Sequence, residues 1–199
     1  MNRIINLVVM ILLFTTSFSQ DLKTPSPGKS IVYFTRYDAT GFLINFKYFD
    51  GEKYLGKFNY GKYLIYECDP GKHIFWSKAE NMDFIDANLE ADKIYIIDSS
   101  PQMGAIKAGV KLIPFSNQLD NYDRYKKRIF KSLEKGVEFK ANEQDLKEDA
   151  DELKDLIKKG LEKFKVLKLD EDSSKIEYLF PYMFYDKNYF KEKDLTNKK

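Results

Sequence analysis

The chain has very few of the side chains that build metal centres and covalent-catalysis sites. It contains one cysteine, Cys68, and one histidine, His73, among 199 residues. One cysteine excludes an internal disulfide and a cysteine cluster for zinc, and one histidine excludes His–His metal pairs. Outside the reducing cytoplasm, the fold must therefore be held by its hydrophobic core.

The chain also lacks a strong charge of one sign and a long apolar run beyond residue 19. Its formal net charge is +2, and a near-neutral chain has no overall electrostatic footprint for nucleic acid or anionic lipid. No later apolar run approaches the about 20 residues that a membrane-spanning helix needs. We therefore expect neither a nucleic-acid partner nor a transmembrane span in the mature chain.

Residues 1–19 have the layout of a cleavable signal peptide. Arg3 supplies positive charge, and the apolar run 4–14 is short for a membrane span but typical of a signal core. Small and polar residues follow up to a cut before Gln20, although an uncleaved anchor or a buried core segment is the alternative. We predict an exported protein, periplasmic or extracellular. No cysteine follows the apolar run, so we expect no lipid anchor.

Residues 30–116 form a series of short strand patterns after a linker at 20–29, whose two prolines and one glycine disfavour helix and sheet. Apolar residues alternate from Phe42 to Tyr48, as in a half-buried strand. Asp50-Gly51 and the Pro-Gly turn before His73 are hairpin signals. About eight strands at this spacing favour a β-sandwich or a barrel. Because no helical pattern connects them, we predict an antiparallel β-sandwich of 7–8 strands.

After residue 116 the periodicity becomes helical. One stripe ends near Gly136, and a longer stripe from Leu146 to Phe164 follows Asn142, a suitable N-cap, with acids first and bases last. We predict a helical extension at 117–165 and an aromatic-rich tail at 166–199, so that the fold is mainly β with segregated helices. The longer stripe contains a glycine and spans under three heptads, which favours packing on its own β domain over a coiled coil.

Several short patterns suggest chemistry, and each has a simpler interpretation. Cys68 and His73 flank one hairpin turn, but a buried thiol and a hydrogen-bonded histidine are commoner than a nucleophile pair. The Ser-x-x-Lys spellings at 26–29 and 132–135 lack their companion motifs. The run 170–174 opens like a calcium loop but lacks its glycine and closing glutamate. We therefore predict no catalytic, cofactor-binding or metal-ligating residue, and no cofactor.

Aromatic residues are abundant, with 14 tyrosines and 16 phenylalanines. Trp76 and the tyrosines near it could stack on a sugar or a peptide, although rings of this kind more often fill a core. The segment from Ile176 to Phe190 is crowded with tyrosine and phenylalanine. If these rings are exposed, we expect them to be the contact surface for a partner.

Residues 30–116 carry a series of motifs in a set order: the opening strand at 31–36, the Asp-Gly hairpin at 50–58, the Gly-Lys-Tyr at 61–63, the Asp-Pro-Gly-Lys-His turn at 69–73 and the closing segment 91–95. With these motifs the segment resembles the bacterial envelope domain filed as domain-of-unknown-function family 2846. The resemblance implies an exported β-sandwich with no assigned activity and no catalytic residues. Members often look like lipoproteins, and this chain departs from them because it has no acceptor cysteine.

We therefore expect a non-catalytic envelope or secreted module that binds a protein or a cell-surface polymer. The helices would cover an edge of the sandwich or present a partner surface. Two alternatives stay open. One is a structural or stress-response accessory without a specific ligand, which a fully covered aromatic tail would favour. The other is a hydrolase, which needs a polar cleft with convergent carboxylates or a Ser/Lys pair.

Overall fold

The computed structural model describes residues 22–103, 108–141, 150–170 and 175–186. The predicted signal peptide, the Asn142 cap and the end of the chain lie outside these ranges. Residues 22–29, most of the expected linker, contain neither helix nor strand.

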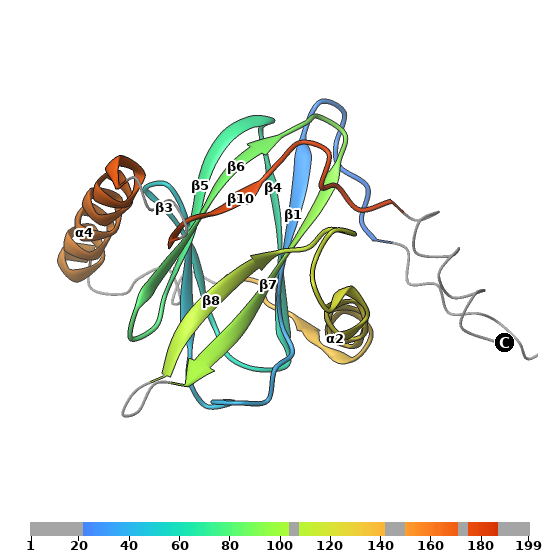
Figure 1. Cartoon of the computed structure of the whole chain (residues 1–199), viewed down its shortest axis with the longest axis horizontal. Coiled ribbons are helices and arrows are strands. Elements are labelled where there is room, and N and C mark those ends of the chain that lie inside the picture. The colour runs from blue at the N-terminus through green and yellow to red at the C-terminus, as the bar shows by residue number, and fades with distance from the viewer. Residues whose placement is uncertain (1–21, 104–107, 142–149, 171–174, 187–199) are drawn as a thin grey trace, which may run out of the picture.

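The described chain is mainly β and folds into two five-stranded sheets that face each other (Figure 1). The first sheet has the order β8 (Ala108–Pro114), β7 (Ile94–Met103), β1 (Ser30–Arg36), β4 (Lys62–Cys68) and β9 (Val137–Glu138). The second has the order β10 (Glu177–Leu179), β6 (Met82–Leu89), β5 (Gly71–Lys78), β2 (Phe46–Asp50) and β3 (Lys53–Phe58). Fully buried rings such as Phe34, Tyr48 and Phe75 fill the space between them, so the predicted mainly β, sandwich-like fold with later helices is confirmed.

The prediction of purely antiparallel pairing is wrong, because both sheets are mixed. β1 pairs with β7 in parallel, with Ile31 opposite Ile94, while β10 pairs with β6 and β9 with β4 in the same sense. Parallel neighbours need a long crossover connection, which is usually a helix. Here strands β2 to β6 provide the crossover between β1 and β7 by visiting both sheets. The absence of a helical pattern between strands therefore did not exclude parallel pairs.

The strand expected to start at Phe42 begins instead at Phe46. The guanidinium of Arg36, which is fully buried, donates from Nη2 to the Gly41 carbonyl at 2.9 Å and from Nη1 to the carbonyl of Ile44. It also lies 3.6 Å from the centre of the Phe46 ring. Gly41 has a φ of 61°, which favours glycine. These contacts hold residues 37–45 as a loop and leave Phe42 exposed at its tip.

Asn81, which directly precedes β6, and Asp83 on β6 satisfy the backbone of β8 where the two sheets meet. Asn81 Nδ2 donates to the Val110 carbonyl at 2.9 Å, and the Val110 N–H donates to Asn81 Oδ1 at 2.6 Å. The Leu112 N–H donates to Asp83 Oδ2 at 2.7 Å. Gly109 allows this approach, because a Cβ there would lie 2.7 Å from Asn81 Oδ1. This edge of β8 is thus blunted by side chains rather than by another strand.

Helix α2 (Tyr122–Lys135) covers the outer face of the first sheet. Its Ile129 and Leu133 are buried against Ile31, Tyr33 and Ile96, which explains why β1 is buried on both of its faces. The helix ends at Gly136, whose N–H donates to the Ser132 carbonyl at 2.9 Å. The predicted stripe and its stop are confirmed.

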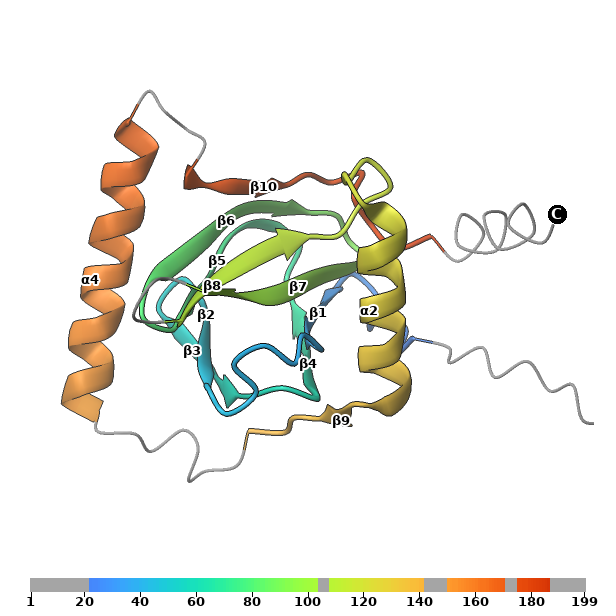
Figure 2. The ribbon, with the colours of Figure 1, turned by 60° about the horizontal axis from the view of Figure 1, so that its bottom comes forward.

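Helix α4 (Ala150–Leu169) covers the outer face of the second sheet, on the opposite side of the sandwich from α2 (Figure 2). Its Phe164 packs on Phe84 with ring centres 5.7 Å apart. Gly160 lies so close to the indole of Trp76 that a Cβ would be 2.7 Å from it. The longer stripe therefore packs on its own β domain, as predicted. Both helices cover sheet faces, whereas covering an edge was one of the two roles expected of them.

Each helix is followed by a strand at the edge of a sheet. β9 follows α2 and pairs with β4, and β10 follows α4 and pairs with β6. The chain beyond residue 116 therefore wraps around the sandwich and extends both of its sheets. Within the described ranges, no helix combines the length and the apolar character needed to cross a membrane.

Candidate binding surface

Residues 175–186 form a strip with one buried side and one exposed aromatic side. Ile176 and Leu179 are buried, with exposed fractions of 4% and 1%. Tyr178 and Phe180 stand on either side of the buried Leu179, as side chains on an extended segment do, and Tyr182 follows in a turn. Their rings are near-parallel, at 5.8 Å and 13° for the first pair and 5.5 Å and 8° for the second. We call these three residues the aromatic ladder.

The ladder is open to solvent, since Phe180 is 44% exposed and Tyr182 is 58% exposed. Large apolar rings in a row at the surface are unusual in a protein that has no partner, because their exposure to water is unfavourable. Binding a partner would remove them from water. Near-parallel rings also present repeated contact area, and rigid rings lose little conformational entropy on binding. The ladder is therefore the part of the described surface best suited to stacking against a ligand.

Backbone contacts fix the ladder on both sheets. The Tyr95 hydroxyl donates to the Pro181 carbonyl at 2.9 Å, and the Tyr185 N–H donates to the Ile94 carbonyl at 2.7 Å. The Met183 N–H closes a turn by donating to the Phe180 carbonyl at 3.0 Å. The segment thus leaves the second sheet at β10 and crosses to β7 of the first, which holds the rings in place before any ligand binds.

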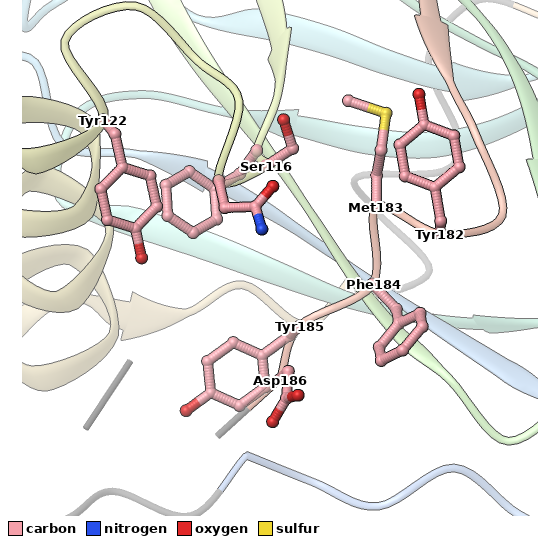
Figure 3. Close-up of a pocket in the computed structure, with 9 residues that line it drawn as sticks. Ser116, Tyr122, Tyr182, Met183, Phe184, Tyr185 and Asp186 are labelled. Atoms are coloured by element: carbon pink, nitrogen blue, oxygen red, sulfur yellow. The ribbon is translucent and has the colours of Figure 1, made fainter. Parts of the chain in front are cut away.

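A small pocket of about 150 Å³ opens next to the last ring of the ladder (Figure 3). Tyr122 of α2 stands on one side of it and the 182–186 segment on the other, and Tyr122 stacks on Phe115 at 5.4 Å. Sites for small molecules usually exceed about 300 Å³. This pocket therefore suits one ring or side group of a larger ligand. Its lining consists of Phe115, Ser116, Asn117, Tyr122, Tyr182, Met183, Phe184, Tyr185 and Asp186.

The pocket offers stacking and hydrogen bonding but few ionisable groups. Asp186 is the one carboxylate among its lining residues. Two cations border the aromatic strip: Lys168 Nζ lies 5.1 Å from the Tyr178 ring centre, and Lys93 Nζ lies 4.2 Å from that of Phe184. The convergent carboxylates or Ser/Lys pair that a hydrolase needs are not among the lining residues.

His73 lies near Cys68 in sequence, but both of its ring nitrogens are engaged elsewhere. Nδ1 is 2.8 Å from Asp50 Oδ2, and Nε2 is 2.8 Å from the Asp69 carbonyl oxygen. Both partners accept hydrogen bonds, so these contacts favour the form of the ring in which both nitrogens donate. Burial lowers the pKa of His73, but the hydrogen bond and charge of Asp50, with the contribution of Asp69, outweigh it and raise the pKa.

The thiol of Cys68 is not activated. Burial, reinforced by the neighbouring carboxylates Asp50 and Asp69, raises its pKa to about 12. A nucleophilic cysteine needs the opposite shift, which makes the thiolate available near neutral pH. The hypothesised Cys68–His73 pair therefore lacks both a free base and a thiolate.

The other sequence patterns have structural roles. Lys29 pairs with Asp69 at 2.6 Å, and Ser132 lies on the buried face of α2. Asp170 pairs with Lys175 at 3.1 Å, residues 171–174 lie outside the described ranges, and the described residues contain no group of three or more His, Cys, Asp or Glu side chains placed to hold a metal. Trp76 is fully buried and donates its indole N–H to the Gly51 carbonyl at 2.9 Å, which confirms the core interpretation.

Sequence reasoning missed a buried ionic cluster between α2 and the first sheet. Asp98 on β7 is fully buried; it accepts from Thr35 Oγ1 at 2.9 Å and from Nη2 of Arg128. Arg128 Nη1 also donates to Asp38 Oδ2 at 2.9 Å. Burial raises the pKa of Asp98, while Arg128 and Thr35 act against that shift. An acid directly after the apolar run 94–97, at the α2-facing position of β7, is the sequence signal that could have revealed it.

No protein-family model, no curated protein and no solved structure matches the chain. The resemblance to family 2846, the export of the protein and its function therefore stay predictions.

Proposed function

We propose that the protein is an exported, non-catalytic module that binds an envelope or cell-surface polymer through the aromatic ladder and the adjoining pocket. The observation that carries this proposal is the row of near-parallel rings at Tyr178, Phe180 and Tyr182, of which Phe180 and Tyr182 are exposed to solvent and Tyr178 is half-buried. A structural accessory without a ligand would be expected to cover such rings.

The spacing of the rings favours an extended ligand over a compact one. Two successive ring-to-ring distances of 5.8 and 5.5 Å give a regular series of flat contacts along the strip. A polymer with repeated flat faces, such as the apolar faces of sugar rings, stacks on several of these rings at once. The small pocket beside Tyr182 then takes one side group of that polymer.

The binding test uses purified mature protein and insoluble envelope polymer from the producing cells. We expect the wild-type protein to sediment with the polymer. The double variant Phe180→Ala/Tyr182→Ala should bind about tenfold more weakly or worse, because each stacked ring contributes roughly 0.5–1.5 kcal/mol. The matched control is Phe42→Ala, which removes a ring that is 57% exposed at the loop tip away from the ladder.

Equal sedimentation of all three proteins would contradict the proposal, since binding would then not depend on the ladder. Capture of one stoichiometric protein, with no retention on polymer stripped of protein, would identify a protein partner in place of the polymer. The length distribution of the polymer, measured before and after incubation, tests the non-catalytic part. Shortening of the polymer by wild-type protein would establish a hydrolase.

A further inference from the structure

Helix α2 concentrates positive charge that the composition of the whole chain conceals. Its 14 residues contain six lysines and arginines and two acids, Asp123 and Glu134, whereas the formal net charge of all 199 residues is only +2. The near-neutral total therefore says little about this part of the surface, and a local electrostatic footprint exists where none was expected.

The exposed cations of α2 lie on one side of the helix. Arg124, Lys127 and Lys131 are exposed and follow each other at three- and four-residue steps, so they share one face and span about 10 Å along the axis. That face is opposite the buried Ile129 and Leu133. The cations line a shallow groove together with Tyr37, Asp123 and Arg128.

The floor of the groove is rigid. Arg128 keeps its side chain only 12% exposed because Asp98 and Asp38 hold its guanidinium from two sides. Its charge is therefore compensated within the protein. On the adjoining wall, Tyr37 packs against Tyr60 with ring centres 5.2 Å apart. The groove is thus built on fixed side chains, with the exposed cations at its rim.

The three rim cations have no ion-pair partner among the described residues. Asp123 lines the groove with Arg124, Lys127 and Lys131, and the exposed Glu134 follows Lys131 by three residues, but none of the three cations forms an ion pair with them. By contrast, α4 pairs Lys159 with Asp155 and Lys168 with Asp86, each at 2.6 Å. Three neighbouring like charges destabilise a helix slightly. An external anion would give these cations the partner that the described residues do not.

We propose that this groove is a second binding site, which takes a polymer with repeated phosphate groups. Three cations spread over about 10 Å match several charges in a row better than one phosphate ion. Arginine and lysine are the usual partners of phosphate oxygens. The site is separate from the aromatic ladder and does not depend on the function proposed for it.

The probe is long-chain inorganic polyphosphate, with orthophosphate and poly-glutamate as comparison anions. We expect the full-length mature protein to bind polyphosphate with an affinity that falls steeply with salt. The variant Arg124→Gln/Lys127→Gln/Lys131→Gln should bind about tenfold more weakly at low salt, and the slope of log affinity against log salt should fall by about 2–3.

The matched control removes the same three charges from the other helix. Lys154, Lys158 and Lys165 of α4 are exposed, and their triple glutamine variant should bind polyphosphate like the wild type. Equal losses in both triple variants would overturn the site, because only net charge would matter. Equal binding of poly-glutamate would overturn its assignment to phosphate, and failure of the wild type to bind polyphosphate would overturn the proposal. Phe180→Ala/Tyr182→Ala should leave this binding unchanged.

Discussion

Helices α2 and α4 each cover one outer face of the sandwich, but their contacts differ in kind. α2 combines buried apolar residues with an ionic anchor, in which Arg128 reaches the fully buried Asp98. α4 uses apolar contacts, with Gly160 against Trp76 and Phe164 against Phe84. Both helices also reach their sheet through an ion pair, but the Lys168–Asp86 pair of α4 is partly exposed, whereas the Arg128–Asp98 pair of α2 is buried.

The solvent-exposed faces of the two helices differ in whether their cations form ion pairs. On α4 two lysines have acid partners at 2.6 Å, which is typical of a solvated cover. On α2 three exposed cations share one face without an ion pair in the described residues. The comparison indicates that α4 serves mainly to bury the second sheet, whereas α2 buries the first sheet and also presents a charged surface.

The largest expected effect is the loss of the ionic anchor of α2. Arg128→Met should destabilise the protein by about 3–5 kcal/mol, because it leaves the buried Asp98 carboxylate without its counter-charge. Urea unfolding measures the change. Adding Asp98→Leu to this variant should recover part of the loss, since the unpaired charge is then removed. A cost below about 1 kcal/mol for Arg128→Met would show that α2 does not need the anchor.

The apolar contact of α4 should be almost as costly to lose. Phe164→Ala removes a buried ring, and such changes cost about 3 kcal/mol. Trp76 is the one tryptophan of the chain and lies under α4, so its emission should shift to the red as the helix loosens. Arg128→Met should leave the emission of its folded state unshifted. A red shift in both variants would mean that the two helices are not independent covers.

Gly160→Ala tests the close approach of α4 to Trp76. The added methyl would meet the indole at 2.7 Å, and overpacking of this kind costs about 1–3 kcal/mol, partly offset by the better helix propensity of alanine. We expect a net loss of about 1 kcal/mol. In a Trp76→Phe background the contacting ring is absent, so Gly160→Ala should become neutral or stabilising. An unchanged loss in that background would contradict the packing argument.

The dependence of stability on pH tests a contribution that comes from the sandwich and from neither helix. The folded pKa of His73 is raised, so its contribution to stability is complete below the unfolded value of about 6.5 and is lost as pH rises through the folded pKa. His73 is the one histidine of the chain. His73→Gln should therefore remove most of the change in urea midpoint around neutral pH. A change that persists in this variant would have to come from another group.

The smallest effects are expected at the rim of the α2 groove. Lys127→Gln and Lys131→Gln should each change the free energy of unfolding by less than about 0.5 kcal/mol, since exposed side chains without partners contribute little. A slight gain is expected from relief of repulsion between like charges. A loss above about 1 kcal/mol in chemical denaturation would show that these lysines stabilise the fold, which would weaken the argument for an external anion.

Much of the fold is predictable because the signals are local. Alternation and turn residues such as Asp50-Gly51 mark the strands between 30 and 116, and helical spacing marks α2 up to Gly136. Neighbour relations are not local. The parallel pairing of β1 with β7 joins residues more than 60 positions apart, and no periodicity encodes it.

The candidate sites are less predictable, for two physical reasons. Sequence periodicity predicts the face of an element on which a residue lies, but it does not predict which faces stay uncovered in the folded protein. The exposure of Phe180 and Tyr182 is therefore visible only in the structure. Buried polar partners also come from distant segments: Arg36 reaches a loop that its sequence pattern predicted to be strand, and Arg128 reaches Asp98 across 30 positions. Net charge averaged over the chain likewise conceals the basic face of α2.

The most direct test of the proposed function is a binding isotherm of the mature protein on solubilised envelope polymer, measured for the wild type and for Phe180→Ala/Tyr182→Ala. The account predicts a dissociation constant about tenfold or more higher for the variant, with unchanged Trp76 emission and urea midpoint. Identical dissociation constants for the two proteins would contradict the claim that the aromatic ladder is the binding surface.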